Sequence, residues 1–178
     1  REECRDTLVL REGVKYEELG QGKIVGTSSI RRRAEIEGLI SGCMVKEIRG
    51  NIHTRLNKLD LGEYDALILA AAGLKRAGLE DRISKIFEIT EMTPAPGQGA
   101  IAVEVRENDE EINLLMTKIN DLKIEKAVKT ERAFAAYFGG GCHSPVGAYC
   151  EIKEGTAILY GSVLQDGIMV KKSISCEE

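Results

Sequence analysis

The sequence predicts an α/β protein that continues into a smaller α+β unit. Over the first 95 residues, short apolar stretches alternate with helix-like stretches, as in chains built from βαβ units. Residues 94–99, Pro-Ala-Pro-Gly-Gln-Gly, then interrupt the pattern as a linker or crossover would. After Pro145, three strand-like stretches separated by Glu-Gly and Asp-Gly turns indicate a three-stranded antiparallel sheet.

In the first half, each expected strand leads into an expected helix. Strands are expected at residues 1–10, 23–25, 45–48 and 65–70. Helices are expected at residues 30–40, at a stretch with Ile52, Leu56 and Leu59 on one face, and at residues 71–76. Residues 66–70 are continuously apolar, which is typical of a strand buried on both faces of a parallel or mixed sheet.

The second half is expected to hold four strands and two helices. The strands are expected at residues 100–105, 148–152, 156–163 and 168–174, and the helices at residues 110–120 and 124–138. The later helix and the last three strands together form the predicted α+β unit.

The composition is that of an ordinary globular protein, with 43% hydrophobic and 30% charged residues in a chain of 178. No apolar run approaches the roughly 20 residues of a membrane span, so no membrane partner is expected. Five cysteines without repeated spacing favour a reducing, cytoplasmic location over a disulfide framework. Two histidines without a Cys-x-x-Cys pair give no convincing metal site.

Positive charge is concentrated in one segment of an acidic chain. The formal net charge is −4, yet residues 23–58 contain eight basic and three acidic residues. This distribution favours a local site for a small anion over general attraction to polyanions, and few aromatic residues accompany the basic ones. Nucleic acid is therefore not expected as a partner.

The basic residues gather where two strands lead into helices. Thr27, Ser28 and Ser29 precede Arg31 and Arg32, and Arg49, Gly50 and Asn51 precede Arg55. Helix N-termini bind anions through unpaired backbone N–H groups, and arginine grips carboxylates through paired hydrogen bonds. These residues are therefore candidates for a polycarboxylate site. The alternative is a solvated helix face on which Arg31 or Arg32 pairs with Glu35.

A glycine-rich loop presents one cysteine. Gly139, Gly140 and Gly141 precede Cys142, and Pro145 stiffens the exit from the loop. A thiol in such a loop is accessible enough to be an attachment point. The alternative is a small buried hydrophobic residue in a glycine-rich turn.

Five motifs occur in one order along nearly the whole chain. They are Gly26-Thr-Ser-Ser-Ile-Arg-Arg32, Arg49-Gly-Asn51 with Thr54-Arg-Leu56, Tyr64-Asp-Ala66 with Ala72-Gly-Leu74, Pro96-Gly-Gln-Gly-Ala100, and Glu131-Arg-Ala133 with Gly140-Gly-Cys142 and Pro145-Val-Gly147. In this combination the chain resembles the porphobilinogen deaminase (hydroxymethylbilane synthase) family.

The resemblance implies a transferase of haem and other tetrapyrrole biosynthesis. It joins porphobilinogen units head to tail with loss of ammonia and releases hydroxymethylbilane. A dipyrromethane cofactor is covalently attached by a thioether, here to Cys142, and holds the oligopyrrole intermediates. The cofactor-binding and substrate-binding residues implied are Thr27, Ser28, Ser29, Arg31, Arg32, Arg49, Gly50, Arg55 and Gln98.

The resemblance also implies a division of the chain. Residues 1–95 correspond to the second of two domains of the type II periplasmic-binding-protein kind. Residues 96–119 would cross over and return to a first domain, and residues 120–178 would form the cofactor-bearing third domain. The family's catalytic aspartate lies in a His-Ser-x-Lys-Asp stretch that does not occur here. No catalytic residue is therefore assigned, the chain alone is expected to be inactive, and the full-length protein is expected to be a monomer.

Two other functions fit parts of the sequence. A non-enzymatic carboxylate-binding module of the periplasmic-binding-protein type explains the arginines but not the cysteine loop. A thiol redox protein would use Cys142 and Cys150, although their spacing matches no redox motif. Intact-mass measurement separates the three hypotheses. A cofactor adduct on Cys142 supports the deaminase, a free thiol leaves the binding module open, and a Cys142–Cys150 bridge favours the redox protein.

Overall fold

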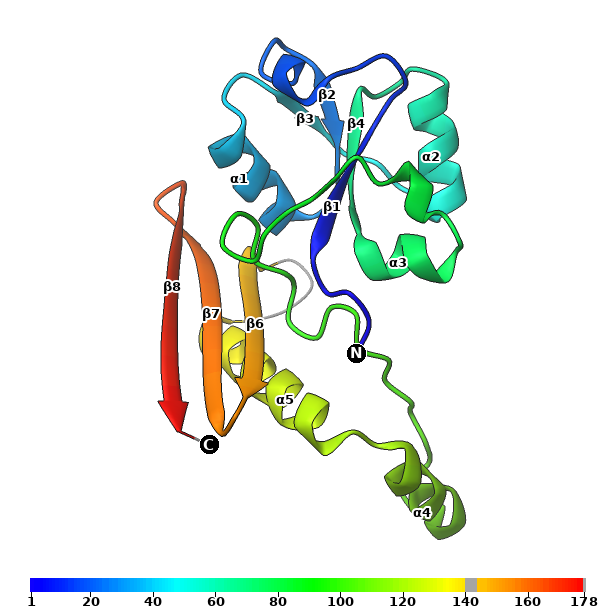
Figure 1. Cartoon of the computed structure of the whole chain (residues 1–178), viewed down its shortest axis with the longest axis vertical. Coiled ribbons are helices and arrows are strands. Elements are labelled where there is room, and N and C mark those ends of the chain that lie inside the picture. The colour runs from blue at the N-terminus through cyan, green and yellow to red at the C-terminus, as the bar shows by residue number, and fades with distance from the viewer. Residues whose placement is uncertain (140–143, 178) are drawn as a thin grey trace.

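The computed structural model describes residues 1–139 and 144–177, and it contains two sheets (Figure 1). A five-stranded mixed sheet with helices on both faces occupies the upper part of Figure 1, and a three-stranded antiparallel sheet lies below it. The predicted fold class, α/β followed by a small α+β unit, is confirmed.

The strand order of the larger sheet is β3-β2-β4-β1-β5. These strands are β1 (Asp6–Leu10), β2 (Ile24–Gly26), β3 (Met44–Lys46), β4 (Ala66–Ala70) and β5 (Lys85–Ile86). Strands β3, β2 and β4 are parallel, whereas β1 is antiparallel to both of its neighbours, β4 and β5. The first strand of the chain therefore lies inside the sheet, beside β4, which begins 60 residues after β1 begins.

Helices cover both faces of this sheet. Helix α1 (Ile30–Leu39) packs on one face, and α2 (Ile52–Asp60) and α3 (Ala71–Arg76) pack on the other (Figure 1). Alternate residues of β4 serve the two cores, since Ile68 lies in the α1 core and Leu67 in the α2 core. Two short 3₁₀ helices, Tyr16–Glu18 and Glu80–Arg82, lie in the connections.

Polar side chains cap the starts of α1 and α2. The Ser29 Oγ atom accepts a hydrogen bond from the Arg32 N–H at 3.3 Å, which begins α1. The Asn51 Oδ1 atom accepts one from the Thr54 N–H at 2.9 Å, which begins α2. Each cap satisfies a backbone donor that the helix itself leaves unpaired.

The C-terminal unit packs one helix on a meander of three strands. Its elements are α5 (Leu122–Tyr137), β6 (Val146–Lys153), β7 (Thr156–Gln165) and β8 (Ile168–Glu177). Both turns have positive φ at two successive residues, Glu154-Gly155 and Asp166-Gly167, which is the geometry of tight hairpin turns. Gly161 on β7 has no side chain because the Phe134 ring of α5 lies where a Cβ would stand.

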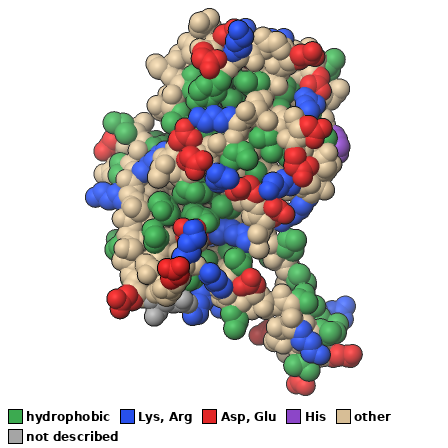
Figure 2. All heavy atoms as spheres, viewed as in Figure 1, with side chains coloured by type: hydrophobic (Ala, Val, Ile, Leu, Met, Phe, Trp, Pro, Cys, Tyr) green, Lys and Arg blue, Asp and Glu red, His purple; other side chains and the backbone are tan. Residues whose placement is uncertain are grey.

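The strand predicted at residues 100–105 is wrong. Within residues 1–139 and 144–177, they pair with no strand, and Ile101 is 76% exposed. They lead to α4 (Glu110–Ile119), on the extension at the lower right of Figure 2, where hydrophobic side chains face outward. None of the helices in the described residues is long and apolar enough to cross a membrane.

Glu131 of α5 joins the crossover, the chain start and β6. Its buried carboxylate accepts hydrogen bonds from both terminal nitrogens of Arg1, at 2.5 and 3.0 Å. It also accepts from the backbone N–H groups of Gly97, at 2.7 Å, and Cys150, at 2.8 Å. A single buried carboxylate thus fixes the C-terminal unit against residues 96–99.

Candidate anion-binding site

The two basic helix starts lie at the same edge of the larger sheet. They follow β2 and β3, which are adjacent and parallel, so both loops leave from the carboxyl ends of their strands. The loops are also tied together. The Thr27 N–H donates to the Lys46 carbonyl at 3.0 Å, and the Ser28 hydroxyl donates to the Ile48 carbonyl at 2.5 Å.

At the start of α1, one buried carboxylate faces two arginines. Asp6, the first residue of β1, lies with its Oδ2 atom 2.8 Å from Arg31 Nη2 and its Oδ1 atom 2.8 Å from Arg32 Nη2. Gln98 completes the cluster, because its amide donates to Asp6 Oδ1 at 2.9 Å and accepts from Arg32 at 3.2 Å. We call these four residues the Asp6 cluster. It carries one more positive than negative charge.

The Asp6 cluster holds Arg31 inside the protein. Its side chain is only 3% exposed, and its Nη1 atom donates to the Thr93 carbonyl at 2.6 Å. Burial would raise the pKa of Asp6, but attraction from Arg32 and Arg31 outweighs burial and holds that pKa below its usual value. Arg31 therefore belongs to the framework of the site, and Arg32, 14% exposed, is the arginine of this pair that borders solvent.

The start of α2 is more open. The Arg55 Nε atom donates to the Gly50 carbonyl at 2.8 Å, which aligns the guanidinium with the turn. Gly50 itself has a φ of 118°, and a Cβ there would meet Thr54 side-chain atoms at 2.8 Å, so only glycine fits. The Arg49 side chain is 84% exposed and pairs with Glu47 on the surface.

The charge of Arg32 at the first helix start acts on Arg55 at the second. The pKa of Arg55 is lowered, first by burial and then by repulsion from Arg32. Arg55 forms no salt bridge within residues 1–139 and 144–177, so its charge has no carboxylate partner there. Arg55 of α2 thus experiences the charge of Arg32 of α1, and the one carboxylate of the Asp6 cluster is shared between Arg31 and Arg32. Such an arrangement favours a bound anion.

The hydroxyl residues serve the loops themselves. Thr27 is buried and its Oγ1 atom accepts from the Ser29 N–H, Ser28 bonds Ile48, and Ser29 caps α1. The sequence alternative for the arginines is not realised, because Arg31 and Arg32 pair with Asp6 and not with Glu35. Cys142 lies outside the described residues. Cys150 is buried in the core beneath α5, and burial raises its pKa.

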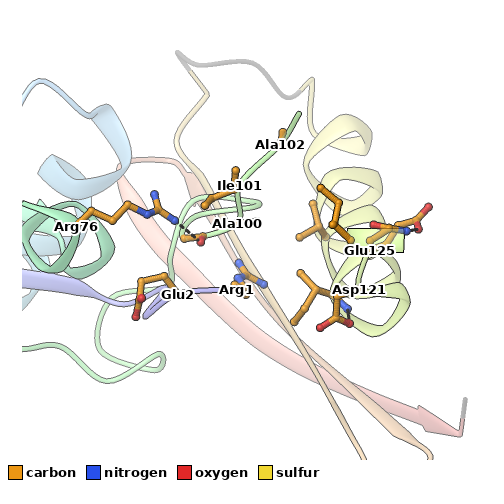
Figure 3. Close-up of a pocket in the computed structure, with 13 residues that line it drawn as sticks. Arg1, Glu2, Arg76, Ala100, Ile101, Ala102, Asp121 and Glu125 are labelled. Atoms are coloured by element: carbon orange, nitrogen blue, oxygen red, sulfur yellow. Dashed lines mark hydrogen bonds between the residues drawn. The ribbon is translucent and has the colours of Figure 1, made fainter. Parts of the chain in front are cut away.

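A pocket of about 560 Å³, which no motif in the sequence indicates, lies beside the crossover (Figure 3). Arg76 lies on one side, with its Nη2 atom 2.9 Å from the Gly99 carbonyl, and Asp121 and Glu125 lie on the other. Charges of both signs and a wall of isoleucines make it a mixed surface. The sequence feature that could have indicated this pocket is the Lys75-Arg76 pair at the end of α3. A basic pair at that position by itself predicts only the end of a helix.

Comparison with known proteins identifies the family. Residues 1–114 match the family model described as porphobilinogen deaminase, dipyromethane cofactor binding domain. Residues 125–177 match the model described as porphobilinogen deaminase, C-terminal domain. The chain belongs to the porphobilinogen deaminase family.

Curated relatives carry the same name. A porphobilinogen deaminase of Geobacillus kaustophilus is 45% identical over 98% of this chain and 57% of its own length. Those of Fusobacterium nucleatum and Roseiflexus castenholzii are 45% and 44% identical, over 93% and 96% of this chain and 55% and 57% of their own lengths. The chain thus spans a little over half the length of these relatives.

One solved structure has a weaker likeness. It is described as an ancestral arginine-binding protein bound to arginine, and it aligns over 77% of this chain and 58% of its own at 21% identity. The TM-score of 0.34 is too low to carry an argument about fold or ligand.

The residues present fit the cofactor that the family model names. A dipyrromethane made from porphobilinogen bears acetate and propionate groups, so it needs several cationic hydrogen-bond donors. Arg32 and Arg55 supply such donors at the two helix starts, and Arg49 adds an exposed guanidinium at the second. The donor set is therefore of the right chemistry for a polycarboxylate.

Proposed function

We propose that this chain supplies the anion-binding and cofactor-bearing part of a hydroxymethylbilane synthase. The enzyme would join porphobilinogen units head to tail with loss of ammonia. The observation that supports this most directly is that the two arginine-bearing helices follow the adjacent parallel strands β2 and β3, with Arg55 lacking a salt-bridge partner in the described residues. A growing oligopyrrole accumulates carboxylates, and such a site would neutralise them.

The chain's own residues would divide the work. Arg32 and Arg55 would bind carboxylates of the cofactor and of bound pyrroles, with Arg49 reaching the more exposed ones. Asp6, Arg31 and Gln98 would keep Arg32 in place, since all of them are bonded within the Asp6 cluster. Hydroxyl and backbone groups at residues 27–29 would hold the loop. We retain Cys142 as the proposed covalent anchor, from which a dipyrromethane presents the end that is extended.

We retain the division into residues 1–95, 96–119 and 120–178 as a proposal. Exposed apolar side chains between residues 101 and 119 support it, because such a stretch is suited to packing against further protein. They are Ile101, Val103, Leu114, Leu115 and Ile119. These residues would return to another domain of the enzyme.

We also propose that this chain alone does not complete the reaction. Stabilising positive charge on a pyrrole nitrogen calls for a carboxylate that faces the ligand. The carboxylate of Asp6 is committed to Arg31 and Arg32, and that of Asp65 to Arg11 and the Ile24 N–H. Incubation with porphobilinogen should therefore yield no hydroxymethylbilane. Sustained product formation would refute this part of the proposal.

A binding experiment tests the arginines. Arg55→Gln and Arg32→Gln should each weaken porphobilinogen binding by roughly tenfold, measured by calorimetry, because each removes one charge-assisted contact. The matched control is Arg82→Gln, since Arg82 pairs with Asp60 at the far end of α2. Equal loss in all three variants, or none in the first two, would contradict the assignment. Intact mass of the purified chain tests the anchor, because a dipyrromethane adduct on Cys142 separates this function from a simple anion-binding module.

A further inference from the structure

Helix α1 carries a second buried charge, which the proposed site does not use. The Glu35 side chain is fully buried, four residues after Arg31, so both lie on the same face of the helix. Its partner is Lys171, whose Nζ atom lies 2.5 Å from Glu35 Oε2. Lys171 belongs to β8, in the C-terminal unit, so the ion pair joins the arginine helix to the other sheet.

Lys171 also contacts the backbone segment, residues 90–93, to which Arg31 is hydrogen-bonded. Its Nζ atom donates to the backbone carbonyls of Thr90, at 3.3 Å, and Glu91, at 2.5 Å. Two residues later, the Thr93 carbonyl accepts from Arg31. Lys171 of β8 is thus connected to Arg31 through its contacts with residues 90 and 91 and the backbone from there to Thr93. Arg31 is in turn connected to Arg32 through Asp6.

Few other features hold α1 against the C-terminal unit. A cleft of about 580 Å³ separates the helix from the β7–β8 turn, which Figure 1 shows reaching up beside α1. Ile30 and Ile168, which line this cleft, are 45% and 70% exposed, so apolar packing is thin there. The pair at the wall of the cleft, with Glu35 buried and Lys171 29% exposed, therefore links α1 to β8 by opposite charges.

We infer that Glu35 and Lys171 are a positioning pair for Arg32, which fixes the arginine helix relative to the cofactor-bearing unit; this rests on the proposed function. The Asp6 cluster holds the first turn of α1. The Glu35–Lys171 pair holds the second turn, so a shift of the C-terminal unit would move the helix that carries Arg32. Neither residue touches the ligand in this proposal.

The test compares Lys171→Met with the double variant Glu35→Gln/Lys171→Met in the 178-residue chain. The single variant leaves the buried Glu35 carboxylate unpaired and could unfold the chain, whereas the double variant removes both charges of this pair. The reporter is the Arg32 Nε–H resonance in ¹⁵N-arginine-labelled protein, because that group donates to Asp6 at 3.0 Å. Porphobilinogen affinity is measured in parallel. Lys153→Met is the matched control, since its pair with Glu151 is exposed.

In the folded double variant, we expect the Arg32 resonance to shift and porphobilinogen affinity to fall roughly fivefold. Lys153→Met should change neither. If the double variant loses only stability, while the Arg32 resonance and the affinity stay as in the parent chain, the pair is merely structural and the inference is wrong. If the parent chain itself does not bind porphobilinogen, the proposed function fails, and the Arg32 resonance alone then decides whether the pair positions the helix.

Discussion

The starts of α1 and α2 have similar sequence signatures but different physical surroundings. Each has a polar cap followed by arginine, and each follows a strand of the same parallel group. At α1, however, Arg31 is 3% exposed and shares a buried carboxylate with Arg32. At α2, Arg49 is 84% exposed, and Arg55 donates to the Gly50 carbonyl without a salt bridge in the described part of the chain.

The difference shows what decides the role of an arginine in a binding site. A guanidinium that is itself buried with its counter-charge, as Arg31 is, stabilises the fold and is not free to gain a second carboxylate, whereas Arg32 still borders solvent. A guanidinium whose neighbours are backbone carbonyls and other cations keeps its attraction for an anion. The site therefore joins a rigid half, built around Asp6, to an open half around Arg55. The predictions below test that distinction.

The largest effect is expected from Asp6→Asn. The change leaves Arg31 buried without a counter-charge, which costs about 3–5 kcal/mol in the free energy of unfolding. Urea denaturation measures it. Asp60→Asn is the control, because the Asp60–Arg82 pair is partly exposed and should cost less than about 1 kcal/mol. Similar costs for the two variants would mean that the Asp6 cluster is no more rigid than a surface pair.

The same carboxylate should make stability depend on pH in acid. Arg32 and Arg31 outweigh the effect of burial and depress the pKa of Asp6 in the folded state. Its contribution is therefore complete above the unfolded pKa of about 4 and is lost as pH falls through the lower, folded pKa. The stability difference between the parent chain and Asp6→Asn should shrink below about pH 4, by at most about 1.4 kcal/mol per pH unit. A difference that is constant down to about pH 2 would contradict this sign.

Local signals in the sequence predict the helices well. Ser29 and Asn51 mark the starts of α1 and α2, and apolar spacing at Leu56 and Leu59 places the buried face of α2. These features depend on residues within one or two turns, so the sequence alone contains the information. The same holds for the Glu-Gly and Asp-Gly hairpin turns of the C-terminal sheet.

Long-range pairing is what the sequence pattern misses. Glu35 is the obvious local partner for Arg31 or Arg32, yet the partner is Asp6, 26 residues before Arg32, because β1 inserts beside β4. The alternating residues Ile101, Val103 and Val105 predict a strand, but a strand needs a hydrogen-bonded neighbour, and none lies beside them in the described chain. The sequence predicts which arginines belong to the candidate site. Which of them are buried with a counter-charge and which remain exposed depends on tertiary contacts.

A smaller effect is expected from removing each cap. Ser29→Ala and Asn51→Ala each remove one side-chain acceptor from a helix start and should each cost about 1 kcal/mol in the free energy of unfolding. Thr156→Ala, at the first residue of β7, is a control with no cap to lose. A cost of several kcal/mol at Ser29 alone would show that this side chain also supports the Asp6 cluster.

The smallest effect on stability is expected from Arg49→Ala. The side chain is largely in water, and its pair with Glu47 is a surface salt bridge, so the free energy of unfolding should change by less than about 0.5 kcal/mol. Porphobilinogen affinity should nevertheless fall, by roughly threefold, because an exposed guanidinium at the open half adds to the attraction for carboxylates. Glu47→Ala is the matched control: it removes the same surface pair but keeps the cation, so affinity should hold or rise. Loss of affinity in both variants would mean that the pair, and not the free charge of Arg49, matters to the ligand.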